Sequence, residues 1–201
     1  RCLVGSEMCI RDRYNIAAGT CTFKKSLSFP KSIAIDNNIL YASYSGGLYV
    51  RNLSTNQDIS CDRNVPNLWG SFGIALDSSR NNFYFHTRSG NDGLINRHTM
   101  SGDCPSTSRA SFVRIKNWRT AYGMDTHPSD DSVIYGSDYW NAKIYKYTLN
   151  SSRNGISSTV SKGIRKNKPS TASKTHIFYP GGVHVDKTCL LYTSPSPRDI
   201  G

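Results

Sequence analysis

Four aspartates recur after short apolar segments, and carboxylates in such a pattern could bind a metal ion. They are Asp36, Asp77, Asp125 and Asp186, spaced 41, 48 and 61 residues apart. If they converged on one point, their oxygen atoms would suit Ca²⁺. Each could instead cap the turn after its segment, because an aspartate accepts hydrogen bonds from its own backbone two residues on. We favour the turn cap.

A second group of residues combines aromatic rings with charges and could bind a small ligand. Its members stand at or near the ends of apolar segments: Trp69, His86, Arg88, Arg119, Asp138, Tyr139, Trp140 and Tyr179. Rings of this kind stack on an aromatic ligand and hold an amine by cation–π contact. Each residue taken singly fits a structural role better, since Trp and Tyr also fill the space between packed sheets. A binding site therefore requires that the fold gather them.

Motifs that would specify a reaction are absent from the sequence. It contains no glycine-rich phosphate loop, no nucleophile elbow, no zinc-protease helix and no paired-cysteine zinc spacing. The sequence therefore indicates no particular reaction, and it leaves open whether the protein is an enzyme. We expect no cofactor.

The two ends of the chain are related to each other at the level of their codons. Codons for residues 7–12 can be read on the opposite strand as Cys189 to Ser194, and the complementarity continues outward. Both ends resemble a translated transposase sequencing adapter. We therefore predict adapter-like artefacts at 1–13 and 189–201 and one domain at 14–188. Recovering the adapter-like codons from genomic DNA would overturn this division.

Composition favours a basic, all-β chain. The sequence has 25 Lys and Arg residues, 14 Asp and Glu residues and a net charge of +11. The two ends hold four of the basic and three of the acidic residues, so 14–188 carries +10 and no glutamate. Abundant Asn, Ser and Tyr suit strands and tight turns better than helices. The charge could attract a polyanion or could simply be solvated, and the apolar runs are too short to span a membrane.

An internal repeat defines the elements that must position these residues. Its first segment occurs four times, at 29–36, 70–77, 120–125 and 179–186. A second apolar segment follows at 39–43, 83–86 and 132–136, and a third at 47–51, 93–97 and 143–147. Fourth, poorly patterned segments are expected near 59–62, 111–116 and 157–163. Four short strands every forty to fifty residues are typical of β-propeller blades.

The repeat predicts an all-β fold, an incomplete β-propeller of about three four-stranded blades from a six-bladed ring. A β-sandwich would not require the same apolar string four times. The first strand of each blade should line the central channel, where glycines at 73, 123 and 181 would let neighbouring blades approach closely. Loops that enter the first strand and loops between the second and third strands share one face. The ligand-binding candidates should therefore meet around the axis.

Three places in the chain resemble the yellow and major royal jelly protein family of secreted six-bladed propellers. They are Gly73–Leu76 with Phe83–His86, Met124–His127 with Asn141–Ile144, and Ile177–Pro180 with Val183–Asp186. The resemblance implies secretion and small-ligand binding, with enzymatic conversion of melanin precursors in only some members. The Cys-Trp pair that usually closes the second segment is absent, and Tyr145 or Tyr147 stands there instead.

Because the Cys-Trp pair is absent, other families of six-bladed propeller also fit the sequence, and we consider two alternatives. One is a calcium-dependent, lactonase-like hydrolase, whose Glu-Asn-Asp ligand set cannot be assembled from residues 14–188 because they lack glutamate. The other is a basic propeller that binds polyanions. Our leading prediction is a secreted propeller that binds a small amine or aromatic ligand on its axial face, without a metal. The oligomeric state is not defined by the sequence.

Cysteines and glycosylation patterns add two expectations. Cys21, Cys61 and Cys104 lie 15, 16 and 21 residues before their repeat aspartates, so we expect equivalent outer positions on successive blades, too far apart to bond with one another. Asn52-Leu53-Ser54 and Asn150-Ser151-Ser152 are acceptor triplets for N-glycosylation, used only if the chain is secreted.

Overall fold

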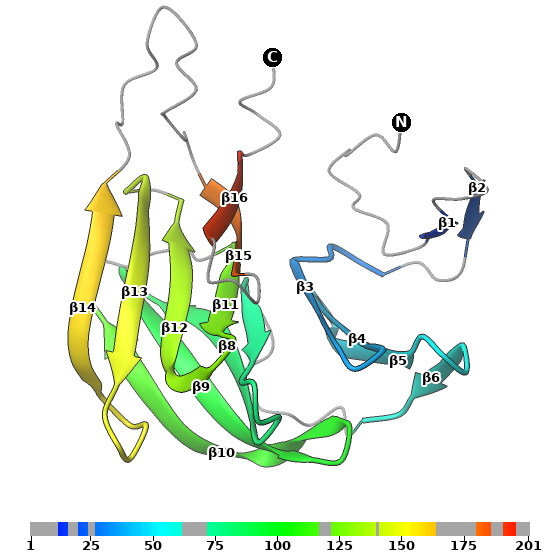
Figure 1. Ribbon diagram of the computed structural model, residues 1–201, viewed down its shortest axis with the longest axis horizontal. Helices are drawn as coiled ribbons and strands as arrows, with labels where there is room; N and C mark the ends of the chain where they lie inside the picture. Colours follow the sequence, from blue (N-terminus) through cyan, green and yellow to red (C-terminus); the bar gives the residue numbers. More distant parts are fainter. Residues whose placement is uncertain are drawn as a thin grey trace, which may run out of the picture.

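Strands make up all the regular structure of the computed structural model, which describes residues 12–15, 20–23, 27–61, 72–116, 122–139, 141–163, 180–185 and 191–195. Three four-stranded antiparallel sheets form its body (Figure 1). Each sheet is built from strands that are consecutive in the chain. The all-β prediction is confirmed, and the three sheets are the predicted blades. The described part of the chain has no helix of the length and apolarity that a membrane crossing requires.

The three blades follow one another along the chain, and each runs from an inner to an outer strand. The first blade comprises β3 (Ser32–Asp36), β4 (Ile39–Tyr44), β5 (Gly47–Asn52) and β6 (Gln57–Ile59). The second comprises β7 (Ile74–Leu76), β8 (Asn82–Ser89), β9 (Asp92–Ser101) and β10 (Cys104–Ile115). The third comprises β11 (Met124–His127), β12 (Asp130–Asp138), β13 (Lys143–Leu149) and β14 (Ile156–Gly163).

Two hairpins accompany the blades. β1 (Asp12–Asn15) pairs with β2 (Thr20–Phe23), and β15 (Pro180–Val185) pairs with β16 (Leu191–Pro195). β15 lies beside β11, in the place of the next inner strand (Figure 1). β1 begins within the adapter-like segment 1–13, and β16 lies within the segment 189–201.

Turn residues with left-handed backbone conformations set the hairpins. Asn37 and Asn38 join β3 to β4 with φ values of 43° and 64°. Gly102 has a φ of 62° in the turn between β9 and β10. Glycine reaches this region without steric cost, and asparagine tolerates it better than most residues. Local sequence therefore determines where these strands reverse.

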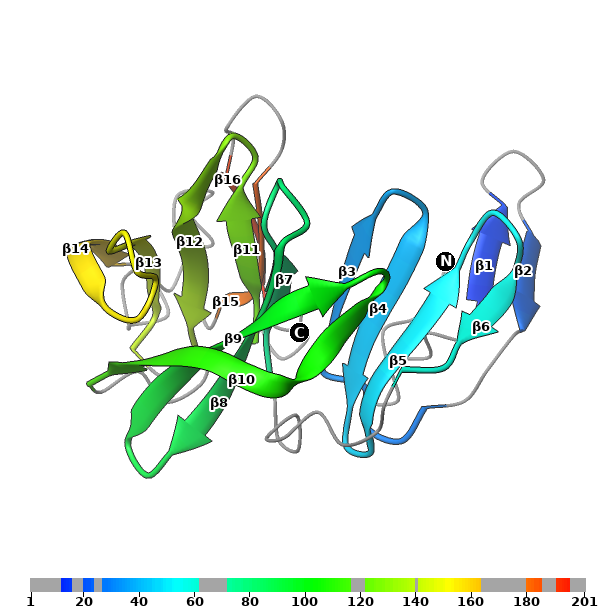
Figure 2. The ribbon, with the colours of Figure 1, turned by 90° about the horizontal axis from the view of Figure 1, so that it is seen from below.

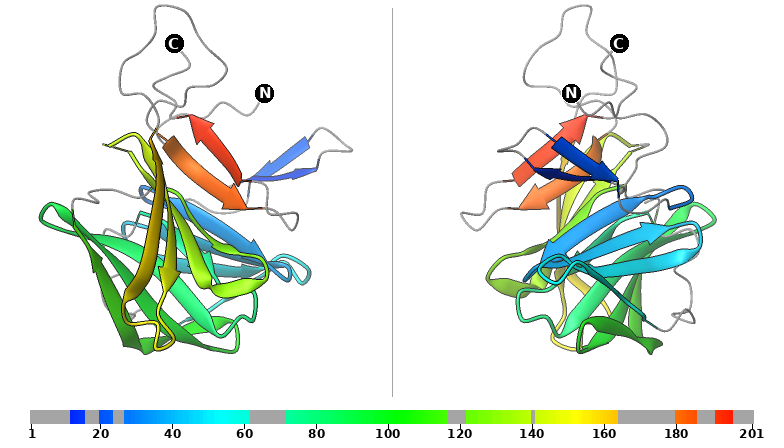
Figure 3. Two further views of the ribbon diagram at one scale, coloured as in Figure 1. Left: turned by 60° about the vertical axis from the view of Figure 1, so that its left-hand side comes forward. Right: turned by 90° about the vertical axis from the view of Figure 1, so that its right-hand side faces the viewer.

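The core lies between blades, because each sheet is apolar on both faces. One cluster joins the first and second blades through Ile39, Tyr41, Val50, Ile74, Phe83 and Phe85. Another joins the second and third blades and includes Ala75, Tyr84, Ile95, Met124, Ile134 and Tyr147. Alternate residues of β7 and β8 thus enter opposite clusters, as expected when side chains alternate across a strand. The side views in Figure 3 show the third blade stacked against the second.

Gly123 confirms the packing reason predicted for the inner-strand glycines. A Cβ atom added there would lie 2.3 Å from the backbone nitrogen of Val183 and 2.6 Å from Gly182. Only a residue without a side chain allows β15 to approach so closely. A larger residue would push the two inner strands apart.

The prediction that the cysteines do not bond with one another is wrong for Cys61 and Cys104. They form a disulfide with a Cα–Cα distance of 5.5 Å. β10 begins at Cys104, earlier than the expected 111–116, whereas Cys61 follows the end of the short β6. The two cysteines therefore occupy opposite ends of their outer strands. The β9–β10 hairpin also reaches toward the first blade (Figure 2), which brings the sulfur atoms together. Side-chain contacts of Cys21 fall outside the described residues.

Candidate functional site

Aromatic side chains gather at the end of the molecule where the inner strands begin. Phe72 stands two residues before β7, Tyr122 two residues before β11, and Tyr139 directly after β12. We call these three residues the aromatic row. All three are half-buried. They come from the two kinds of loop that share the predicted ligand-binding face.

Backbone hydrogen bonds explain why Phe72 and Tyr122 occupy matching places. The carbonyl of Gly73 accepts from the amide of His86 at 2.8 Å, and the carbonyl of Gly123 accepts from the amide of Ser137 at 3.0 Å. The two glycines are therefore equivalent, and the ring preceding each one is equivalent as well. In the first blade Lys31 holds this place, because its amide donates to Ser43 as that of Phe72 donates to His86.

Edge-to-face contacts connect the row. The ring centroids of Phe72 and Tyr122 are 5.4 Å apart at an angle of 80°, and those of Tyr122 and Tyr139 are 5.2 Å apart at 72°. The Lys31 ammonium lies 5.3 Å from the Phe72 centroid, within cation–π range. His86 lies beside Phe72 at 6.3 Å. The two edge-to-face contacts have a geometry that aromatic pairs prefer.

Four of the eight sequence-predicted ligand residues are described, and two of them join this group. Tyr139 belongs to the row, and the buried His86 adjoins it. Arg88 is exposed, and its Nε donates to the Gly90 carbonyl at 2.6 Å within its own hairpin turn. Trp69, Arg119 and Trp140 lie outside the described residues, as does Tyr179. Sequence reasoning missed Phe72 and Tyr122, although their place before the inner-strand glycines could have indicated them.

Asp138 holds a turn beside the row. Its carboxylate accepts from the amide of Asn141 at 3.1 Å and from the Asn141 Nδ2 at 2.7 Å. The residue is fully buried. Burial first, and the Asp138 charge second, raise the pKa of Tyr145. Asp138 therefore shapes the loop that presents Tyr139.

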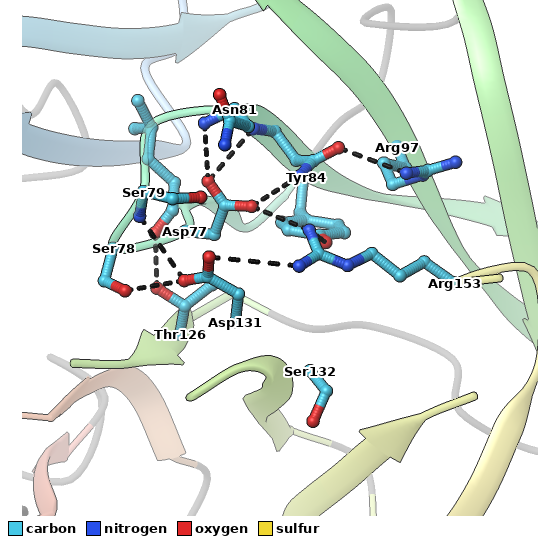
Figure 4. Close-up of polar contacts among 12 residues, drawn as sticks. Asp77, Ser78, Ser79, Asn81, Tyr84, Arg97, Thr126, Asp131, Ser132 and Arg153 are labelled. Carbon is cyan, nitrogen blue, oxygen red and sulfur yellow. Dashed lines mark hydrogen bonds and ion pairs between the residues drawn. The ribbon is translucent and has the colours of Figure 1, made fainter. Parts of the chain in front are cut away.

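A second polar group joins the second and third blades at the other end of the inner strands (Figure 4). Asp77 is its centre, with a side chain that is 0% exposed. Its carboxylate accepts from the amides of Asn81 and Asn82 at 2.9 and 3.0 Å, which confirms the predicted turn cap. Arg153 Nη1, from the third blade, donates to the same carboxylate at 2.9 Å. We call the Asp77–Arg153 pair the buried latch.

Further contacts extend the buried latch between the blades. Arg153 Nη1 also lies 3.4 Å from the Tyr84 hydroxyl, and Asp131 accepts from the Ser78 hydroxyl at 2.6 Å. Burial, reinforced by the Asp77 charge, raises the pKa of Tyr84 to about 12. The Thr126 hydroxyl donates to the Leu76 carbonyl across the same interface.

The first two blades repeat this arrangement with an arginine from a different turn. Asp36 lies 2.5 Å from Arg80 Nε, and Arg80 Nη2 lies 3.4 Å from the Tyr41 hydroxyl and 3.1 Å from Asp103. Tyr41 pairs with Ala34 as Tyr84 pairs with Ala75, so the two tyrosines are equivalent. We call the Asp36–Arg80 pair the open latch, since its side chains are 33% and 29% exposed.

Asp125 does not match the other repeat aspartates, which corrects the sequence alignment. Because Gly73 and Gly123 are equivalent, Asp77 corresponds to His127, and Asp125 lies two residues earlier in its strand. Its carboxylate accepts from the amide of Val185 at 2.8 Å and lies 2.9 Å from His184 Nδ1. Burial raises the pKa of Asp125, and the amides of Val185 and Thr126 oppose this shift.

The described aspartates therefore contact successive blades and do not converge. Among the described residues, no cluster of three or more His, Cys, Asp or Glu side chains could hold a metal ion. Asp186 lies outside the described residues. Within the described structure, the repeat carboxylates join neighbouring blades.

Comparisons with known proteins agree on the fold. Neither the family models nor the curated protein sequences contain a match. Among solved structures, the nidogen/laminin complex is similar with a TM-score of 0.57 and 14% identity, over 84% of this chain and 57% of that chain. The Cps50 (Swd1) β-propeller domain of Myceliophteria thermophila is similar with a TM-score of 0.51 and 9% identity, over 84% and 49%.

A protein of unknown function from Desulfotomaculum acetoxidans is similar with a TM-score of 0.57 and 13% identity, over 88% of this chain and 52% of that chain. The chain spans about half the length of the structures it matches. These likenesses identify the fold as a β-propeller.

Proposed function

We propose that this chain belongs to a secreted propeller that binds a small aromatic or amine ligand at the axial end of its blades. The observation that carries the proposal is the aromatic row, in which Phe72, Tyr122 and Tyr139 from two blades meet while staying only half-buried. Rings buried only for packing would be covered by their neighbours. A half-buried row retains some surface that a planar ligand could contact.

Charge around the row refines the class of ligand. The Lys31 ammonium already lies over the Phe72 ring, so we expect a ligand to contact the row at Tyr122 and Tyr139. The buried carboxylate of Asp138 accepts two hydrogen bonds from Asn141 and holds the loop that carries Tyr139. A flat aromatic amine with its ring on the two tyrosines suits this row, because tyrosine rings also attract a cation.

The disulfide supports secretion. Disulfides persist in oxidising compartments and are rare in the cytosol. Cys61 and Cys104 join two blades across 43 residues of sequence. The motifs shared with the yellow and major royal jelly family favour the same location and the same class of small ligand.

Binding of tyramine tests the proposal. Titration calorimetry on the full chain should show a saturable site that Tyr122→Ala weakens about tenfold, since one aromatic contact contributes roughly 0.5–1.5 kcal/mol. Tyr135→Ala is the matched control, because Tyr135 stacks on His127 away from the row. Equal binding by both variants, or no saturable binding of tyramine, would contradict the proposal.

A further inference from the structure

Two N-glycosylation triplets lie at the same place on different blades. Asn52 is the last residue of β5, and Asn150 directly follows β13. β5 and β13 are the third strands of the first and third blades. Both asparagines therefore begin the turn that leads to an outer strand, and their surroundings can be compared directly.

The turn after Asn52 is complete without its side-chain nitrogen. Asn52 Oδ1 accepts from the amides of Ser54 and Thr55 at 2.9 and 3.0 Å. Arg51 Nη2 holds the far side of the turn through the carbonyl and side-chain oxygen of Asn56, at 2.6 and 2.7 Å. Asn52 Nδ2 donates no hydrogen bond within the described structure, and residues 54–58 are all exposed. The Nδ2 atom is therefore available for modification.

The turn after Asn150 uses its side-chain nitrogen. Asn150 Nδ2 donates to Asn154 Oδ1 at 2.9 Å, while Oδ1 accepts from the Asn154 amide at 3.1 Å. A Cβ atom on Gly155 would lie 2.9 Å from the same Nδ2. A sugar on this nitrogen would crowd Gly155 and disturb the paired contacts with Asn154. The same motif thus has a different status in the two blades.

We propose that Asn52 is an N-glycosylation site and that the folded chain leaves Asn150 unmodified. The inference rests on the proposed secretion. In the reaction, Nδ2 bonds to the anomeric carbon of a lipid-pyrophosphate-linked oligosaccharide and loses one proton. The bond from that carbon to the pyrophosphate oxygen breaks, and lipid pyrophosphate leaves. The product keeps the Oδ1 contacts that form the turn.

Expression of the full chain behind a secretory leader in cultured insect cells tests the site. Peptides from the medium and from the membrane fraction are analysed by mass spectrometry before and after enzymatic deglycosylation. Ser54→Ala removes the first triplet but keeps the backbone amide that Asn52 holds. Ser152→Ala is the matched variant for the second triplet. We expect one glycan on the wild type, lost in Ser54→Ala and retained in Ser152→Ala.

An unmodified Asn52 in chains that have entered the secretory pathway would overturn the proposal, as would a glycan on Asn150 in the folded, released protein. Because the added leader ensures entry, these outcomes do not depend on where the natural protein resides. Secretion itself is tested separately by whether the Cys61–Cys104 disulfide is present in protein taken from its natural source. Its absence would count against secretion alone.

Discussion

The open latch and the buried latch use the same three groups in different surroundings. Each joins an aspartate and a tyrosine of one blade to an arginine of the next. In the open latch, Asp36 is 33% exposed, and a disulfide joins the same two blades. In the buried latch, Asp77 is 0% exposed and lies beside the larger apolar cluster. We therefore expect burial to decide how much each ion pair contributes to the free energy of unfolding.

The two arginines reach their partners from different turns. Arg80 lies between β7 and β8, whereas Arg153 lies between β13 and β14. Both have left-handed backbones, with φ values of 56° and 53°. Alanine is the appropriate test substitution, because it keeps the cost of a left-handed residue, whereas glycine would relieve it. Arg→Ala variants therefore report the loss of the side chain.

Removing the disulfide should have the largest effect. Cys61→Ser with Cys104→Ser frees a loop closed across 43 residues, which the chain-entropy model values at about 4 kcal/mol. We expect that loss in the free energy of unfolding, measured by urea denaturation. Reduction of the wild type should reproduce it. An unchanged midpoint would show that the interface between the first two blades holds without the bond.

Arg153→Ala should have the second largest effect, lowering the free energy of unfolding by about 3 kcal/mol. The substitution leaves the buried Asp77 carboxylate without its cation, and breaking a buried pair typically costs 3–5 kcal/mol. The bonds from Asn81 and Asn82 to Asp77 reduce the expected loss to the lower end of that range. Urea denaturation measures it. A loss no greater than that of Arg80→Ala would show that burial does not separate the two latches.

Arg80→Ala should lower the free energy of unfolding by about 1 kcal/mol or less. Asp36 is 33% exposed, so water can reach its carboxylate once Arg80 is gone, and ion pairs near the surface contribute less than fully buried ones. This effect should shrink further in high salt, while that of Arg153→Ala should not. Denaturation at low and high ionic strength makes the comparison. Equal salt dependence of the two variants would contradict it.

A buried histidine should give the smallest effect, and one that depends on pH. Burial lowers the pKa of His98, which lies 5.1 Å from the Phe85 ring, below its ordinary 6.5. The folded state therefore favours neutral His98, so its stabilisation is present above pH 6.5 and is lost as the pH falls toward the lowered pKa. His98→Gln should flatten the decline in the free energy of unfolding below pH 6.5, as measured by urea denaturation at a series of pH values. An unchanged slope would contradict the assignment.

Sequence reasoning succeeded where structure follows from neighbouring residues. Alternating apolar residues and Asn or Gly turns predicted the strands, and Asp77 caps its turn as expected. Reasoning failed at Asp125, because this residue follows its inner-strand glycine by two positions, whereas Asp77 follows Gly73 by four. It also failed at Cys104, because β10 is much longer than β6. In both cases the spacing along the sequence is close to that of the repeat. A residue's place in a strand, however, changes with a shift of even one residue.

By itself, the sequence determined the strand content, the repeat and the antiparallel blades, because side-chain alternation and turn chemistry act over a few residues. Only the tertiary structure decided which arginine reaches which aspartate, that Cys61 meets Cys104, and that Phe72 and Tyr122 form one row. These contacts join residues 43 to 76 positions apart, or rings on separate blades. They depend on strand lengths and on how neighbouring blades stack, which no local pattern contains.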